Sequence, residues 1–249
     1  MTTSIFIKTY YNDHKWLQYL LPSIQKYAED FESVVIVSDQ GHIIPSEYLQ
    51  TITKIPVFVH YVPLPTIYPN NIEHGLGYLW QQYIKLNWMT YCSSSSILIL
   101  DSDEMLTKHL RPSDFKYNEK WVWSYRPWSE SGTAICWKGC TDTILRINTP
   151  YEAMCITGFI MTRDATAKLL NYLNMLYENN DLWNIINKNN ILRMSEFNMY
   201  GSFIHHINSN DYYFNIKRDI ELINQSIVKH WSWGGISPEI HNKNMSYLV

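Results

Sequence analysis

The feature that most limits the fold of this chain is the apolar run Ile97–Leu100, which ends directly in Asp101-Ser102-Asp103-Glu104. Four consecutive aliphatic residues without polar alternation predict a strand that is buried on both faces. Such strands belong to parallel sheets that helices cover on both sides. The run therefore predicts an α/β fold with a mostly parallel sheet, and it places three carboxylates at the carboxyl end of one strand.

The first half of the chain repeats this alternation of strand and helix. Runs of β-branched and aromatic residues predict strands, and apolar residues at helical spacing predict helices. The expected strands are 4–10, 33–38, 57–62 and 97–100, and the expected helices are 16–24 and 78–91. The second half is less regular, with strands expected at 121–125, 156–161 and 212–216, helices at 165–177 and 197–207, an irregular or polar helical stretch at 178–190, and a loop from residue 237 onward. This order predicts a Rossmann-like sheet flanked by helices.

Composition excludes several classes of protein. A net charge of −3 and the lack of a basic stripe argue against a nucleic-acid binder. No stretch approaches the roughly 18 apolar residues of a membrane span, and the N-terminus does not resemble a secretory signal. The four cysteines form no disulfide framework, and Cys136 and Cys140 lack the second pair of a zinc set. We therefore expect reduced thiols in a cytoplasmic protein.

The carboxylates of Asp101, Asp103 and Glu104 predict a cation site. Like charges this close together are unfavourable unless a cation or a proton shares the site. Carboxylate, phosphate and water oxygens are the usual ligands of Mg²⁺ or Mn²⁺. The structural alternative is that Asp101 caps a helix and that Asp103 is a solvated turn residue. The buried strand that precedes them favours the metal site, because ligands bind at the carboxyl ends of parallel strands.

The segment Asp101-Ser102-Asp103, after a hydrophobic strand near residue 100, resembles the D-x-D motif of GT-A glycosyltransferases. The segment 77–86, GYLWQQYIKL, followed by LDSDEML, is similar to a subgroup of small transferases of bacteria and large DNA viruses. The segment Ser195–Gly201 resembles a downstream acidic segment of that subgroup. The resemblance implies a single GT-A domain over 1–249, with a nucleotide-binding half at 1–104 and a less regular acceptor-binding half at 105–249.

The same resemblance implies a function. It implies metal-dependent transfer of a sugar from a nucleotide-sugar donor, expected to be a UDP-sugar, to a glycan acceptor, and a cofactor of Mn²⁺ or Mg²⁺. Inversion at the anomeric carbon is expected, and a retaining transfer, which needs no such strong base, is the alternative. The first alternative is a nucleotidyltransferase, although 9–15 (TYYNDHK) lacks the glycine of a phosphate loop. The second is a non-catalytic nucleotide- or sugar-binding module of the same fold.

Candidate donor-binding residues follow the first two strands. Thr9, Tyr10 and Tyr11 lie where GT-A enzymes hold the nucleobase and ribose, and a tyrosine ring is suited to stacking on uracil. Asp39 is in the matching place to accept the N3–H of uracil or a ribose hydroxyl. The alternatives are an aromatic strand end that packs on the core and an aspartate that forms a turn.

Three further donor-binding candidates lie near the motif. Gln81 and Lys85 share one helix face at i, i+4, from which Lys85 is expected to reach the diphosphate or the donor sugar. Ser102 lies between the two motif carboxylates. The alternative for Lys85 is an ordinary solvated helical lysine.

The remaining candidates come from the second half of the chain. The resemblance implies a histidine as a further metal ligand; His230 is preferred because Gly234 and Gly235 follow it, and the alternatives are His205 and His206. An inverting transfer needs a general base, for which Glu196 is the choice. Other candidate bases are Asp142 and Glu152, and the alternative for Glu196 is a carboxylate that stabilises a helix N-terminus.

Overall fold

The computed structural model of this protein describes residues 1–67, 76–155, 157–178, 180–189, 191, 193–216, 226–230 and 234–249. Ile156, at the start of one expected strand, lies outside the described residues. Contacts divide the chain into two compact units, the first with residues 1–63, 91–115 and 221–249 and the second with residues 64–90 and 116–220. The single domain expected over 1–249 stays a prediction.

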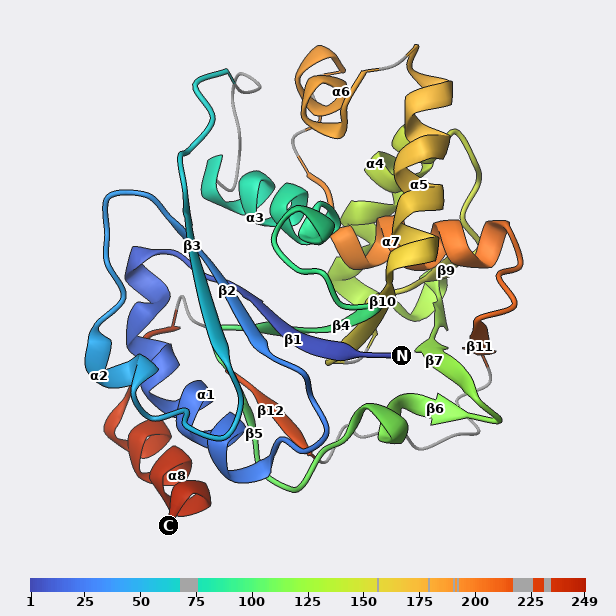
Figure 1. Ribbon diagram of the computed structural model, residues 1–249. Helices are drawn as coiled ribbons and strands as arrows, with labels where there is room; N and C mark the ends of the chain where they lie inside the picture. Colours follow the sequence, from blue (N-terminus) through green and yellow to red (C-terminus); the bar gives the residue numbers. More distant parts are fainter. Residues whose placement is uncertain are drawn as a thin grey trace. The chain divides into compact units, whose positions relative to one another are not determined.

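A parallel sheet is the centre of the first unit (Figure 1). Its strands are β1 (Thr3–Lys8), β2 (Val34–Asp39), β3 (Val57–Val62) and β4 (Ser96–Asp101). They lie in the order β4-β1-β2-β3, and each neighbouring pair is parallel. β1 is buried along its whole length, and β2 and β4 along all but their last residue, as their continuous apolar sequences predict. The α/β fold expected from the sequence is confirmed.

Helices connect these strands and cover the sheet. The first unit has α1 (His14–Tyr27), the short α2 (Ser46–Leu49) and α8 (Pro238–Leu248). Apolar residues of α1 recur at helical spacing and are buried, with Trp16, Leu17 and Leu20 almost wholly excluded from solvent. The helix α1 follows β1 and precedes β2 in the chain, and its apolar face is buried, as the sequence predicts.

A small antiparallel ladder adds to the first unit. β5 (Glu104–Leu106) pairs with β12 (Ile227–Lys229), so that Lys229 lies opposite Glu104. The turn between β4 and β5 is only two residues long, Ser102 and Asp103. The acidic segment is therefore held between two strands rather than in an open loop.

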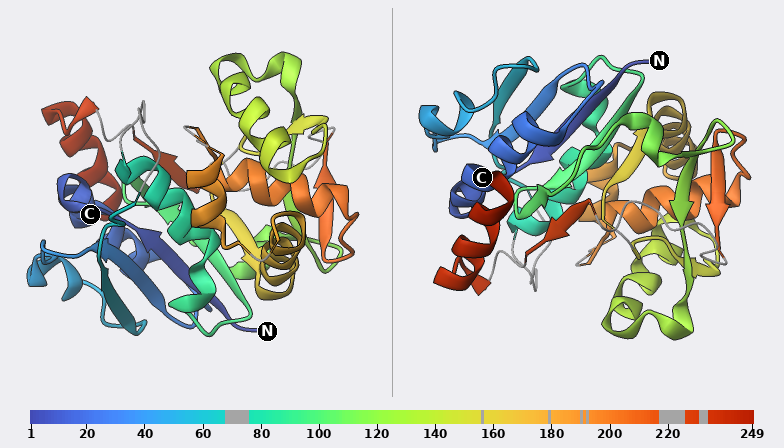
Figure 2. Two further views of the ribbon diagram at one scale, coloured as in Figure 1. Left: turned by 90° about the horizontal axis from the view of Figure 1, so that it is seen from above. Right: turned by 90° about the horizontal axis from the view of Figure 1, so that it is seen from below.

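The expectation of a loop from Ser237 onward was wrong, because residues 238–248 form α8. The Ser237 side chain caps this helix by accepting a hydrogen bond from Ile240 N at 3.2 Å, and Pro238 occupies its first turn. α8 packs on α1, and the two lie side by side in both views of Figure 2. Apolar side chains that cover the buried pair Trp16 and Tyr19 include Ile240, Tyr247 and Leu248. A helical period in a mostly polar sequence is a weak signal, which explains the error.

The second unit contains the remaining elements. Its helices are α3 (Leu76–Leu86), α4 (Lys138–Leu145), α5 (Arg163–Leu176), α6 (Leu182–Lys188) and α7 (Glu196–His206). Its strands are β6 (Lys116–Tyr117), β7 (Lys120–Ser124), β8 (Arg126–Pro127), β9 (Tyr151–Glu152), β10 (Phe159–Thr162) and β11 (Tyr212–Asn215). Short 3₁₀ helices in the two units are Tyr11–Asp13, Trp88–Thr90, Pro112–Phe115, Trp128–Glu130 and Gly132–Trp137.

The helix α7 is the buried centre of the second unit, and its first nine residues are all buried. It contacts α3, α4, α5 and β9. Gly201 permits this packing, because a Cβ at that position would lie 2.5 Å from Trp123 Nε1 and would also collide with Ala153 Cβ. The helix expected at 197–207 is thus present, shifted by one residue.

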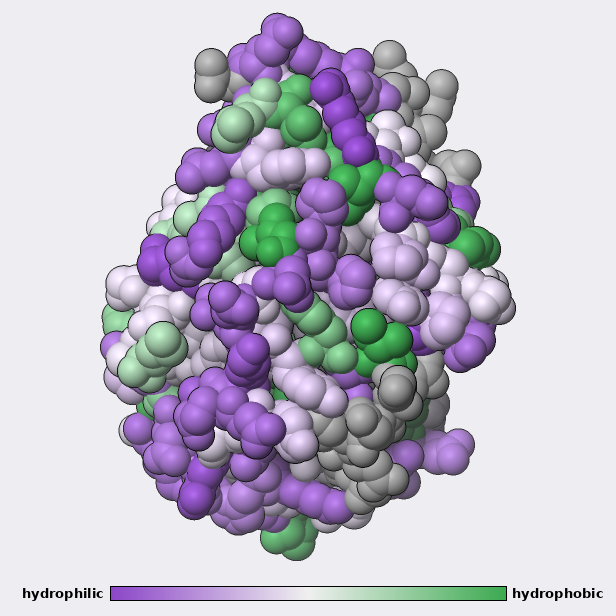
Figure 3. Space-filling view, turned by 90° about the vertical axis from the view of Figure 1, so that its right-hand side faces the viewer, coloured by the Kyte–Doolittle hydropathy of each residue, from purple (hydrophilic) through white to green (hydrophobic). Residues whose placement is uncertain are grey.

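In the face that Figure 3 shows, hydrophobic residues lie scattered among hydrophilic ones. None of the helices described is both long and apolar enough to cross a membrane.

Candidate functional site

The three motif carboxylates lie together at the carboxyl end of β4. Asp101 is the last residue of this strand, and Glu104 begins β5. Glu104 Oε2 accepts a hydrogen bond from the backbone N–H of Asp101 at 2.9 Å. Asp103 and Glu104 are buried, with 8% and 4% of their surface exposed. The strand thus delivers the carboxylates to the edge of a parallel sheet where ligands usually bind.

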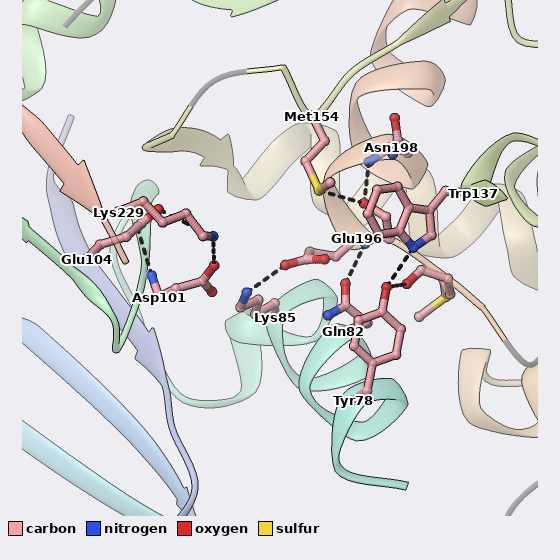
Figure 4. Close-up of polar contacts among 12 residues, drawn as sticks. Tyr78, Gln82, Lys85, Asp101, Glu104, Trp137, Met154, Glu196, Asn198 and Lys229 are labelled. Carbon is pink, nitrogen blue, oxygen red and sulfur yellow. Dashed lines mark hydrogen bonds and ion pairs between the residues drawn. The ribbon is translucent and has the colours of Figure 1, made fainter. Parts of the chain in front are cut away.

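A lysine from the C-terminal part of the chain neutralises this cluster. Lys229 Nζ lies 2.5 Å from Asp101 Oδ2 and 3.6 Å from Glu104 Oε1 (Figure 4). The antiparallel pairing of β12 with β5 places Lys229 there. Sequence reasoning missed this residue, and its one signal was its position next to His230.

The carboxylates and the Lys229 ammonium group shift one another's pKa values. Burial raises the pKa of Glu104 to about 7, while Lys229 opposes this rise and Asp101 and Asp103 add to it. Burial on its own would lower the pKa of Lys229, but the carboxylates of Asp101, Glu104 and Asp103 raise it well above its ordinary value. The site therefore stabilises positive charge.

His230 is held beside the motif. Its backbone N–H donates to the Asp103 carbonyl at 2.8 Å, and its ring stacks on Trp16 with centroids 5.5 Å apart. His230 Nε2 lies 2.8 Å from Asn244 Oδ1, and in the tautomer that donates to this oxygen the lone pair of the neutral ring is on Nδ1. Burial lowers the pKa of His230. The neutral ring with a lone pair is the form that ligates metals.

The carboxylates of the motif and the imidazole of His230 are chemically suited to bind a divalent cation. Carboxylates and a neutral imidazole are ordinary ligands of Mn²⁺, and the cluster already accommodates one positive charge. Among the residues described, no three histidine, cysteine, aspartate or glutamate side chains converge in a preformed metal site. Asp101 is instead paired with Lys229.

The carboxyl ends of β1 and β2 are joined by a second buried ion pair. Lys8 Nζ lies 2.7 Å from Asp39 Oδ1 and donates to the Thr9 carbonyl at 2.6 Å. Thr9 Oγ1 is buried and makes no hydrogen bond within the described part of the chain. Asp39 thus has a structural partner, which the sequence did not reveal, and its role toward a nucleotide stays a prediction.

Two tyrosines follow β1 and are exposed. Tyr10 and Tyr11 have 38% and 59% of their surface accessible. The ring of Tyr11 stacks on His42 at 4.2 Å between centroids and meets His14 edge-on. Burial raises the pKa of Tyr10, as do Asp13 and Asp103. Tyr11 is thus exposed although its ring stacks on His42, and its role toward a nucleobase stays a prediction.

In the second unit, two candidate residues form a buried ion pair. Lys85 Nζ of α3 lies 2.7 Å from Glu196 Oε1 of α7 (Figure 4). Gln82 Oε1 accepts the backbone N–H of Glu196 at 3.0 Å, and Lys85 Nζ lies 5.1 Å from the centroid of the Phe197 ring. The helix face that meets Glu196 therefore carries Gln82 and Lys85, and Gln81 is only half-buried.

More hydrogen bonds surround this pair. Tyr78 donates its hydroxyl to the Met194 carbonyl at 2.7 Å and accepts from Trp137 Nε1 at 2.8 Å. Burial raises the pKa of Tyr78, and the nearby Glu196 adds to the rise. The Ser195 side chain caps α7 by accepting from Asn198 N at 3.2 Å. The start of α7 is thus rigidly held.

The alternative candidates have other surroundings. Asp142 pairs with Lys138 at 2.5 Å, and the buried Glu152 pairs with Arg126. His205 lies among aromatic rings, 5.4 Å from Tyr151 between centroids, and burial lowers its pKa.

Comparisons with known proteins give a family and a fold. A model described as "Family of unknown function (DUF6492)" matches residues 2–236. No curated protein matches. The fold is similar to that of the galactosyltransferase LgtC, whose crystal structure is a complex with donor and acceptor sugar analogues. The TM-score is 0.50 and the identity 12%, over 85% of this chain and 72% of that chain. The chain belongs to the DUF6492 family, and its fold is of the GT-A type.

Proposed function

We propose that this member of the DUF6492 family is a metal-dependent glycosyltransferase that moves a sugar from a UDP-sugar to a glycan acceptor with inversion. The observation that carries the proposal is the cluster of Asp101, Asp103 and Glu104 at the carboxyl end of β4. In folds of this kind the ligand binds at that edge of the sheet. Three carboxylates compensated by an ammonium group suit a site that receives a cation and a diphosphate.

The cation would be held by Asp101, Asp103 and His230. The supporting observations are the hydrogen bond between His230 N and the Asp103 carbonyl and the orientation of the imidazole by Asn244. Bound Mn²⁺ or Mg²⁺ would supply positive charge to the leaving diphosphate. Ser102, buried between the two aspartates, would position the motif backbone.

The nucleotide would be bound at the ends of β1 and β2. Tyr11 offers an exposed ring to the base, with Tyr10 beside it. Thr9 and Asp39 offer a hydroxyl and a carboxylate to the base edge or ribose, although Asp39 would have to share its carboxylate with Lys8.

The acceptor proton would go to Glu196. A general base must be ionised, and Lys85 at 2.7 Å stabilises the ionised carboxylate. In this proposal Lys85 acts on the base, and its contact with the donor, together with that of Gln81, stays a prediction. The cytoplasmic location expected from the sequence is also part of the proposal.

A thermal-shift panel of nucleotides and nucleotide sugars, each with Mn²⁺ or with EDTA, tests this function. We expect UDP and one UDP-sugar to raise the melting temperature only with Mn²⁺, because ligands that bind the folded state stabilise it. Asp103→Asn should abolish the Mn²⁺-dependent shift. The matched control Asp30→Asn changes an aspartate that is 75% exposed in its side chain and should keep the shift.

Two outcomes would separate the alternatives. A shift with UDP that is the same in EDTA would contradict the metal dependence and favour a non-catalytic binding module. A shift with nucleoside triphosphates alone would favour a nucleotidyltransferase.

A further inference from the structure

Lys229 places a positive charge directly against two carboxylates of the motif segment. Its ammonium group lies 2.5 Å from Asp101 Oδ2 and 3.6 Å from Glu104 Oε1, and its side chain is 28% exposed. The backbone of β12 holds it there, because Lys229 is paired with Glu104 in the ladder. The ammonium group is therefore held next to the carboxylates by the position of its backbone in the ladder.

The contact of Lys229 with Asp101 occupies a carboxylate oxygen of the motif. Asp101 Oδ2, one of the oxygens that a divalent cation would need, is directed at Lys229 Nζ (Figure 4). An ammonium group and a divalent cation within about 4 Å of one another repel strongly at a partly buried site. The two cations therefore cannot share Asp101 without cost.

We propose that Lys229 competes with the divalent cation for Asp101, and that a diphosphate relieves this competition by taking over the ammonium group. The inference rests on the proposed function, since it assigns a regulatory role to a residue of that same site. The cation displaces the Lys229 ammonium from Asp101, and the ammonium group then pairs with the phosphate oxygens of the nucleotide. The cation and the nucleotide each increase the affinity for the other, because such coupling is reciprocal.

Competition makes a prediction that differs from that of a simple phosphate-binding lysine. A lysine that binds phosphate without contacting Asp101 would leave the affinity for the cation alone nearly unchanged when it is removed. A competing lysine would lower the affinity for the cation alone, so its removal should make the cation bind more tightly. The binding of Mn²⁺ in the absence of any nucleotide separates these two roles.

The experiment measures Mn²⁺ binding by electron paramagnetic resonance with the parent protein, Lys229→Met and the control Lys54→Met. Lys54 is exposed and precedes β3, at the opposite end of the strands from the motif. We expect Lys229→Met to bind Mn²⁺ alone about tenfold or more tightly than the parent, as removal of a nearby unit charge implies. UDP should raise the Mn²⁺ affinity of the parent and of Lys54→Met, and have a much smaller effect on Lys229→Met.

An unchanged or weaker affinity of Lys229→Met for Mn²⁺ alone would overturn the inference, whatever UDP does. Lys229→Arg keeps the charge and should keep the low affinity of the parent, so a tighter site in Lys229→Met would be due to loss of the charge. Failure of the proposed function has a different signature, in which UDP binds none of these proteins at any Mn²⁺ concentration.

Discussion

Lys85 of α3 and Glu196 of α7 form an ion pair that is almost wholly withdrawn from water, with an Nζ–Oε1 distance of 2.7 Å and exposed side-chain fractions of 1% and 2%. These residues are 111 positions apart in the sequence. A pair this deeply buried is sensitive to the loss of one partner, because removing one charge leaves the other buried without its counterion in this pair. The pair therefore links the stability of the second unit to the proposed chemistry of Glu196.

A double-mutant cycle measures how strongly Lys85 and Glu196 stabilise each other. Lys85→Met should lower the free energy of unfolding by about 3–5 kcal/mol, since it leaves a buried carboxylate without its cation. The double variant Lys85→Met/Glu196→Gln should lose clearly less than the sum of the two single changes. Urea denaturation measures the free energy of unfolding of the two single variants and the double variant. A loss in the double variant equal to the sum of the two single losses would contradict a coupled pair. Lys168→Met, at an exposed pair with Asp164, is the control and should leave the free energy of unfolding nearly unchanged.

Glu196→Gln separates catalysis from structure. The change keeps the shape of the side chain and removes its basicity. If Glu196 is the general base, turnover per folded molecule should fall by about 10²–10⁴ with donor affinity almost unchanged. Initial rates and UDP binding measure these effects. Normal turnover would move the base to Asp142 or Glu152 or favour retention, which the anomeric configuration of the product, assigned by NMR, would decide.

The fold of the first unit was predictable because local and long-range preferences agree there. The continuous apolar segments of β1, β2 and β4 have one stable environment, a covered parallel sheet, and the helical period of α1 fits the same arrangement. α8 was missed because its burial depends on contacts with Trp16 and Tyr19, more than 200 residues earlier in the chain.

The candidate site was predictable only in part. A strand that ends in carboxylates predicted that Asp101 and Asp103 lie at the carboxyl end of β4, where they are found, because strand direction alone brings them there. Their role as metal ligands stays a prediction. The cations that compensate these and other carboxylates were not predictable. Lys229 is 128 positions from Asp101 in the sequence and reaches it through the pairing of β12 with β5. Lys8 reaches Asp39 across two neighbouring strands. Single-sequence patterns contain no information on such distant pairs.

Tyr11→Ala tests the proposed position of the nucleobase. Tyr11 is 59% exposed, so its removal should hardly change the stability of the fold. UDP affinity should fall by about 1–3 kcal/mol, the scale of one stacking contact. Tyr11→Phe keeps the ring and should retain most of the affinity, whereas Tyr117→Ala, another exposed tyrosine, should have no effect. Isothermal titration calorimetry measures the affinities, and an unchanged affinity of Tyr11→Ala would place the base elsewhere.

Glu104 should make the stability of the protein depend on pH. Its pKa is about 7 in the folded protein and 4.5 when unperturbed, and the first cause of the rise is burial. Between these two pH values the folded state keeps a proton that the unfolded state has lost, so stability falls as pH rises. The full loss in the free energy of unfolding is about 3 kcal/mol and is reached above pH 7.

The variant Glu104→Gln tests this dependence. Its side chain cannot ionise, so it should unfold at a higher urea concentration than the parent at pH 8, with a smaller difference at pH 5. Glu47→Gln, at an exposed position of α2, should follow the parent at both pH values. A parent protein that is equally stable at pH 5 and pH 8, with Glu104→Gln unchanged beside it, would show that Glu104 is ionised in the folded state and that Lys229 compensates it fully.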